Sequence, residues 1–86
     1  MTKDTDLWKK RLARVGLRPT KSRILILSEL SRKDMHLGAE ELLEHLRENG
    51  EKSSIATIYQ NLHTLADKGL LSRIPANDGV MRFDAN

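Results

Sequence analysis

Apolar residues recur every three or four positions in four segments of the chain, and short polar stretches separate these segments. This spacing places the apolar side chains on one face of a helix, so it predicts amphipathic helices at about 6–15, 21–32, 39–49 and 54–68. The second segment has the widest apolar face, and we expect it at the centre of the core. The side chains expected to face inward are Leu7, Trp8, Leu12, Val15, Ile24, Leu25, Ile26, Leu27, Leu30, Ala39, Leu42, Leu43, Leu46, Ile55, Ile58, Leu62 and Leu65.

The ends of the predicted helices carry capping residues. Thr5 or Asp6 is expected to cap the first helix, and Thr20 and Ser54 are expected to cap the second and fourth. A side-chain oxygen at this position accepts a hydrogen bond from a free backbone N–H group. Glycine tolerates the left-handed backbone that often ends a helix. The glycines that follow the first, third and fourth helices are Gly16, Gly50 and Gly69.

After the fourth helix the apolar spacing changes to the alternation typical of strands. The stretches "LLSRIP" (70–75) and "VMRFDA" (80–85) flank the turn signal Asp78-Gly79 and predict a hairpin. The stretch "RKDMHLG" (32–38) is expected to be a connector. The third and fourth helices are joined by about four residues with a glycine in the turn, which matches helix-turn-helix geometry. The prediction is a mainly α winged helix-turn-helix, with four helices plus a two-stranded wing in one domain over residues 1–86.

The composition excludes several classes of protein. The 86 residues make one small domain with a modest core and no room for a large catalytic cavity. The absence of cysteine excludes disulfides, thiolate metal sites and a cysteine nucleophile. We find no glycine-rich phosphate loop and no paired acid–base motif, so we do not expect an enzyme. The longest apolar run, "ILIL" at 24–27, is too short to cross a bilayer and the N-terminus lacks a signal-peptide pattern, so we expect a soluble cytoplasmic protein with no membrane partner.

Charge is distributed unevenly along the chain. Residues 7–28 carry seven basic side chains and no acidic one, whereas residues 29–51 carry seven acidic side chains and three basic ones. A block of one sign suggests a surface that faces a polyanion. A solvated amphipathic helix explains the block equally well, so charge alone leaves both interpretations open.

The fourth predicted helix is unusual because residues 54–64 contain no charged side chain. Its outer face instead offers hydroxyl, amide and imidazole groups: Ser54, Thr57, Tyr59, Gln60, Asn61, His63 and Thr64. In a helix-turn-helix the second helix lies in the major groove of DNA, where such groups read base edges and acidic ones would be repelled by phosphate. The free N–H groups near Ser53 and Ser54 could bind a phosphate. The alternative is a protein–protein surface.

Two other patterns have simpler explanations. Four acidic residues of the third helix could be misread as metal ligands, but their spacing on an outer face fits a solvated helix; they are Glu40, Glu41, Glu44 and Glu48. Trp8 could stack on a base, but a core position is the more common role of such a residue.

Four stretches of the chain resemble the N-terminal DNA-binding domain of ferric uptake regulator (Fur) family repressors. They are "GLRPTKSRILILSEL", "HLGAEELLEHL", "IATIYQNLHTLADKGLL" and "GVMRFDAN", and the resemblance extends from about Leu12 onward. It implies a double-stranded DNA operator as partner. It also implies DNA contacts from residues at matching positions: Arg14, Arg18, Ser54, Ala56, Thr57, Tyr59 and Gln60. Gln60 stands where the family commonly has arginine, which leaves open whether this position prefers a base or a phosphate.

The resemblance also bears on metal binding. His36 and Asp84 lie where the family often has ligands of its regulatory metal, and an aspartate at 84 resembles the peroxide-sensing or iron-responsive branches. The family continues into a dimerisation domain that supplies further ligands, and we expect this chain to lack that domain, either as a truncated or proteolysed chain or as a regulator without a sensor domain. Because metal sites need three or four ligands, we expect no cofactor in this chain, whereas the full-length family protein binds iron, manganese or zinc. We expect His36, His45 and His63 to be surface residues, and this chain to be a monomer or weak dimer where the full-length protein is a homodimer.

Overall fold

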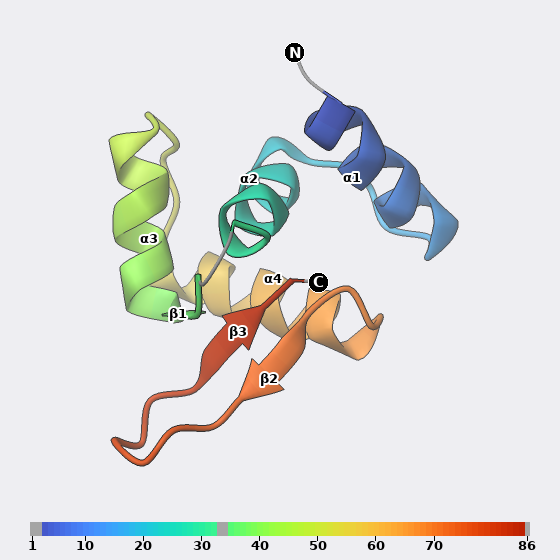
Figure 1. Cartoon of the computed structure of the whole chain (residues 1–86). Coiled ribbons are helices and arrows are strands. Elements are labelled where there is room, and N and C mark those ends of the chain that lie inside the picture. Colours follow the sequence, from blue (N-terminus) through green and yellow to red (C-terminus); the bar gives the residue numbers. More distant parts are fainter. Residues whose placement is uncertain (1–2, 33–34, 86) are drawn as a thin grey trace.

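Helices and short strands follow one another along the chain in an order close to the predicted one (Figure 1). The computed structural model describes residues 3–32 and 35–85. The elements within these residues are α1 (Lys3–Arg14), α2 (Lys21–Leu30), β1 (Leu37–Gly38), α3 (Ala39–Glu48), α4 (Ile55–Asp67), β2 (Ser72–Ile74) and β3 (Arg82–Asp84). The predicted mainly α winged helix-turn-helix is confirmed. Part of the predicted connector, at 33–34, lies outside the described residues.

Two of the predicted helix caps are formed as expected. The Thr20 hydroxyl accepts a hydrogen bond from the N–H of Arg23 (3.3 Å), and the Ser54 hydroxyl accepts one from the N–H of Thr57 (3.2 Å). The prediction for the first helix was wrong, because α1 already begins at Lys3 and both Thr5 and Asp6 lie inside it. Residues 3–6 contain no glycine or proline, so the helix can extend over them.

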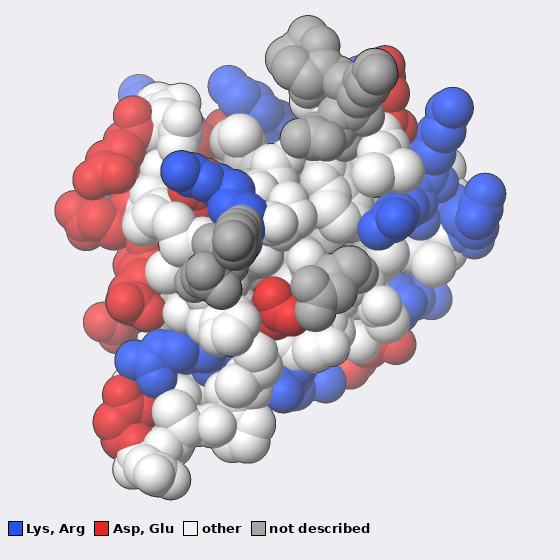
Figure 2. Space-filling view, viewed as in Figure 1, with Lys and Arg blue, Asp and Glu red and all other residues white. Residues whose placement is uncertain are grey.

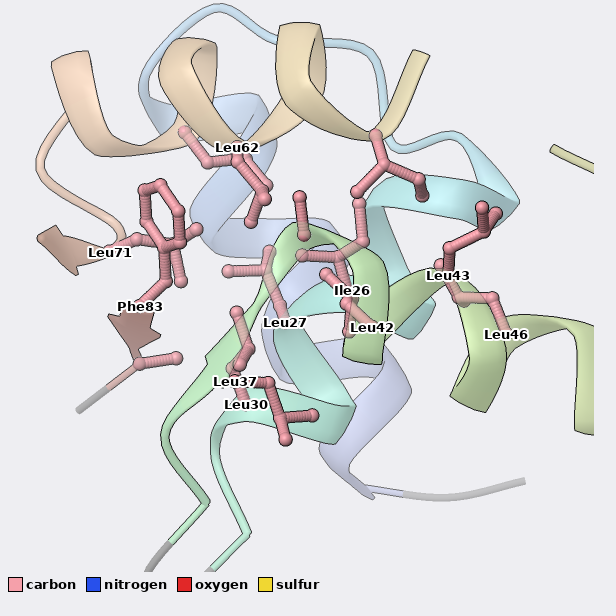
Figure 3. Packing of buried hydrophobic residues seen from close by; sticks show 14 of the residues in the cluster. Ile26, Leu27, Leu30, Leu37, Leu42, Leu43, Leu46, Leu62, Leu71 and Phe83 are labelled. Atoms are coloured by element: carbon pink, nitrogen blue, oxygen red, sulfur yellow. The ribbon is translucent and has the colours of Figure 1, made fainter. Parts of the chain in front are cut away.

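The core lies between the helices and the sheet, with α2 at its centre. Ile26, Leu27 and Leu30 of α2 are completely buried, and Figure 3 shows them among apolar residues of α3, α4 and the strands. Trp8 is 4% exposed, so its predicted core position is confirmed. Leu7 is 42% exposed, which contradicts its predicted inward position. It precedes Trp8 by one residue, and adjacent helical positions point in directions about 100° apart.

The sheet has a third strand that the sequence analysis assigned to a connector. Its order is β1-β3-β2, and both neighbours of β3 run antiparallel to it. Phe83 of β3 lies opposite Leu37 of β1 and Arg73 of β2. The predicted two-stranded wing therefore becomes a three-stranded sheet. A strand of two residues is too short to show any alternation, and only its pairing with β3 defines it.

Helices α3 and α4 form the helix-turn-helix. The chain leaves α3 through Gly50, whose φ of +79° is favourable only for glycine. Glu51 holds this turn against α2, because its carboxylate accepts a hydrogen bond from the Ser22 hydroxyl (2.8 Å).

His45 was expected to be a surface residue, but it is half-buried and its Nδ1 lies 2.7 Å from a carboxylate oxygen of Glu29.

An arginine of β3 holds the loop of the wing. Arg82 donates two hydrogen bonds to the Asp78 carboxylate (3.1 and 3.3 Å) and lies 3.9 Å from a carboxylate oxygen of Glu41. The hydrogen bond from Arg82 lowers the pKa of Asp78 and raises the pKa of the arginine itself. The predicted turn at Asp78-Gly79 is formed, since the N–H of Val80 donates to Asp78 (3.0 Å). The wing thus contacts the first turn of α3.

We predict that Leu62→Ala lowers the free energy of unfolding by about 2–5 kcal/mol, because it leaves a cavity in a closely packed core. Leu62 is completely buried and projects from α4 into the cluster that contains Phe83 and Leu71 (Figure 3). Urea denaturation followed by circular dichroism measures the change. The matched control is Leu7→Ala at the exposed leucine of α1, which should change stability by no more than about 0.5 kcal/mol. Equal losses from both variants would contradict this packing.

Candidate nucleic-acid interface

The N-terminal half of α4 presents an exposed face without charge. Its buried side is formed by Ile58 and Leu62, which anchor the helix in the core. The helical spacing therefore directs the intervening residues outward, and Tyr59 is 45% exposed. The predicted DNA-contacting residues that the structure places on this exposed surface are Ser54, Ala56, Thr57, Tyr59 and Gln60.

Hydroxyl groups organise the first turn of this helix. The Ser54 hydroxyl caps the helix and also lies 3.0 Å from the Thr57 hydroxyl. Ser53 differs from Ser54, because its hydroxyl oxygen is buried and has no hydrogen-bond partner among the described residues. Of the two serines, only Ser54 presents its side chain on the exposed surface.

The uncharged face is narrower than the sequence predicted. Asn61 and Thr64 are half-buried. Asn61 turns towards α2, where its side-chain oxygen accepts a hydrogen bond from Nε of Arg23 (3.2 Å). It is therefore a packing residue of α4 on the side away from Tyr59.

Arg23 connects two elements of the candidate interface, whereas the sequence pattern predicted only that it belongs to the basic block. Besides its bond to Asn61, it donates a hydrogen bond to the backbone carbonyl of Arg18 (3.0 Å). One guanidinium therefore fastens the loop between α1 and α2 to the predicted reading helix. The only signal in the sequence was the position of Arg23 three residues after the capping Thr20, and this position does not determine where the arginine side chain points.

The basic and acidic blocks of the sequence separate in space. Figure 2 shows Lys and Arg side chains gathered over α1 and Asp and Glu side chains along the opposite edge, over α3. Arg14 in the last turn of α1 and Arg18 in the following loop are both exposed. Arg11 instead lies over the Trp8 ring, 5.0 Å from its centre. The predicted exposure of the acidic residues is confirmed for Glu40, Glu41, Glu44 and Glu48.

The C-terminal half of α4 contacts the sheet through His63, which is exposed as predicted. Its ring is stacked with that of Tyr59 at a centroid distance of 6.3 Å and meets the edge of Phe83 at 6.2 Å. A guanidinium nitrogen of Arg73 in β2 lies 3.2 Å from Nδ1 of His63 and donates to Asp67 (3.0 Å).

The two residues matched to metal ligands come together in space. Nε2 of His36 lies 3.8 Å from Oδ1 of Asp84, at the end of β3. Within residues 3–32 and 35–85 there is no group of three or more His, Cys, Asp or Glu side chains that could hold a metal ion. His36 and Asp84 thus bring two donor groups together, whereas a tight metal site needs three or four. The same residues contain no helix that is long and apolar enough to span a bilayer.

The helix pair α3–α4, followed directly by a hairpin, defines the class of the protein as a winged helix-turn-helix domain. The particular family follows from comparison with known proteins. The chain belongs to the ferric uptake regulator family, whose model matches residues 14–86.

Relatives and solved structures agree with this assignment. The chain is 36% identical over 69 residues to the peroxide-responsive repressor PerR of Staphylococcus saprophyticus, covering 80% of this chain and 47% of that protein. The structure of the Vibrio cholerae ferric uptake regulator, described as having DNA-binding domains, is also similar. The match covers 91% of this chain and 60% of the Vibrio chain, with a TM-score of 0.82 and 32% identity. PerR from Streptococcus pyogenes is described as a peroxide sensor and gene regulator. The match covers 98% of this chain and 58% of the PerR chain, with a TM-score of 0.81 and 27% identity. The chain spans about half the length of the curated relatives it matches.

Proposed function

We propose that this chain is the sequence-specific DNA-binding domain of a transcriptional repressor, over residues 1–86, and that α4 reads the major groove. One observation carries the proposal. The loop that carries Arg18 is fastened to α4, because Arg23 hydrogen-bonds to the Arg18 carbonyl and to Asn61, and we propose that this loop and the exposed face of α4 act as one surface. DNA binding requires such a surface, with base-reading groups beside a cation for the backbone.

Each part of this surface has a distinct task in the proposal. The side chains of Tyr59 and Gln60 contact base edges, since an amide can pair with adenine and a ring can pack on a thymine methyl group. Ser54, Ala56 and Thr57 face the groove in the first turn of α4. Arg14, Arg18 and the backbone N–H groups at residues 53–54 bind phosphates, which fix the position of the helix without reading sequence.

A second candidate function is a protein-interaction domain. A cleft of about 410 Å³ lies between the first turn of α3, Tyr59 of α4 and the wing, and its lining includes the exposed side chains of Tyr59, Val80 and Met81. The salt dependence of duplex binding separates the two candidates. Release of counterions makes DNA binding fall steeply with salt, whereas a protein-interaction domain binds no duplex.

We also propose that His36 and Asp84 are two ligands of a divalent metal in the full-length protein, with the remaining ligands outside the described residues. Solved relatives support metal binding in the family. One is a ferric uptake regulator from Pseudomonas aeruginosa with manganese, and the Helicobacter pylori protein is described as having three functional metal-binding sites. The full-length protein is proposed to be a cytoplasmic homodimer without enzymatic activity.

The first prediction from this proposed function concerns base reading. Tyr59→Ala and Gln60→Ala should each reduce the preference for an operator over a scrambled duplex by about 1–3 kcal/mol, because each removes a base contact. The operator is selected by the wild-type chain from random duplexes, and affinities are measured by fluorescence anisotropy. Glu44→Gln, on the outer face of α3, serves as the control. Unchanged discrimination in both alanine variants would exclude α4 as the reader.

The second prediction concerns the phosphate contacts. Arg14→Ala and Arg18→Ala should weaken binding to the operator and the scrambled duplex nearly equally. Each lost contact should reduce the slope of log affinity against log salt by about one. The control is Arg32→Ala, which removes an exposed arginine just beyond the C-terminal end of α2. A loss confined to the operator, with the salt slope intact, would mean that these arginines read bases.

The third prediction concerns metal and assembly. Micromolar manganese, iron(II) or zinc should leave the DNA affinity of this 86-residue chain unchanged, because His36 and Asp84 supply two donors where a tight site needs three or four. The chain should sediment as a monomer or weak dimer. Its operator affinity should lie well below that of a dimeric repressor, since linking two DNA-binding domains raises avidity by roughly 10²–10⁴. Tight, metal-dependent binding by a stable dimer would contradict this interpretation of the two residues.

A further inference from the structure

The ring of Tyr59 is stacked with another ring of the same helix. His63 lies four residues later, so the two side chains are neighbours on one helical face. Their centroids are 6.3 Å apart and their planes differ by 16°. Tyr59 is 45% exposed, so this stacking is a specific contact to a ring that otherwise faces solvent.

The His63 ring is itself fixed by the sheet. Phe83 meets it edge-on, with an angle of 80° between the planes. A guanidinium nitrogen of Arg73 lies 3.2 Å from its Nδ1, and the same nitrogen donates to Asp67 (3.0 Å). A guanidinium can only donate, so Nδ1 must accept and the proton of the neutral ring lies on Nε2. Both the orientation and the tautomer of His63 are therefore set by its neighbours.

The two wing residues that contact His63 come from adjacent strands. Arg73 of β2 is paired with Phe83 of β3, and directly opposite residues of an antiparallel pair share one face of the sheet. That face is turned to α4, since Phe83 is 1% exposed and packs in the core cluster with Leu62. The chain of contacts runs from the sheet through His63 to Tyr59.

We propose that His63 is a positioning residue for sequence reading, by which the wing sets the orientation of Tyr59 before DNA is bound. The inference rests on the proposed function of α4. A free tyrosine samples several rotamers and loses that freedom on binding, whereas a ring held on a fixed support avoids much of the cost. His63 thus raises discrimination between duplexes through Tyr59 and contributes no contact to DNA of its own.

Three substitutions of His63 separate this role from a direct contact. His63→Phe keeps a ring beside Tyr59 and removes the Nε2–H donor, whereas His63→Gln keeps a donor and removes the ring. We expect His63→Ala and His63→Gln to lower operator discrimination by about 2- to 10-fold, the range of an aromatic pair, and His63→Phe to retain most of it. The probes are the selected operator and a scrambled duplex of the same composition. Retention by Gln with loss by Phe, or an equal loss on both duplexes, would show a direct phosphate contact and overturn the proposal.

Coupling provides the second readout. In a Tyr59→Ala background, His63→Ala should cause no further loss of discrimination, because it acts through the missing ring. Arg73→Ala should reproduce part of the effect of His63→Ala, and Ser72→Ala, the preceding residue of β2, should not. If the losses of discrimination from Tyr59→Ala and His63→Ala add fully, the inference about His63 is overturned and the proposed function of α4 is unaffected. If Tyr59→Ala itself leaves discrimination intact, this inference fails, and if Gln60→Ala does so as well, the proposed function of α4 fails with it.

A measurement on the unmodified chain covers the case in which a variant does not fold. Nitrogen-15 shifts of the His63 ring should report a protonated Nε2 and an unprotonated Nδ1, and nuclear Overhauser effects should join the rings of Tyr59 and His63 in the absence of DNA. A ring with the opposite tautomer, or no contact between the two rings, would overturn the proposal.

Discussion

Ile26, Leu27 and Leu30 occupy one face of α2, and the burial of this face is the constraint on which the rest of the domain depends. Helices α1 and α3 pack on α2, and Trp8 and Leu12 of α1 join the same cluster. Full burial of one such side chain is worth about 1.5–3 kcal/mol. In a chain of 86 residues with a small core, these contacts are a large share of what opposes the loss of conformational freedom.

Polar groups on the two ends of α2 then determine how the functional segments are placed. At its N-terminal end, Arg23 fastens the Arg18 loop to Asn61 of α4, and Ser22 bonds to Glu51 in the turn before α4. At its C-terminal end, Glu29 pairs with His45 of α3. Each bond contributes on the order of 1 kcal/mol, which is less than the burial of one leucine. The apolar face makes the domain fold, and the polar ends set the geometry of the candidate interface.

Charged and uncharged side chains are also divided between different helices of the domain. The acidic residues of α3 are exposed on the edge opposite α1 (Figure 2), and two of them, Glu40 and Glu41, also line the cleft beside Tyr59. Polar side chains of α4 are held by other elements, Asn61 by α2 and His63 by the sheet. In the proposed function, this support keeps the side chains of α4 in place before a partner arrives, which favours selectivity over adaptability.

The sequence by itself determined the features that depend on neighbouring residues. Helical spacing, the caps Thr20 and Ser54, and the glycine in the turn are local signals, so the four helices, the helix-turn-helix and the exposed polar face of α4 could be predicted from them. The tertiary structure alone decided the features that depend on residues far apart in the chain. Two residues at 37–38 become a strand only because β3 pairs with them, and Arg23, Asn61, His45 and His63 acquire their roles from partners on other elements. The one-residue difference between buried Trp8 and exposed Leu7 has the same origin, since it depends on which side of α1 the fold turns towards α2.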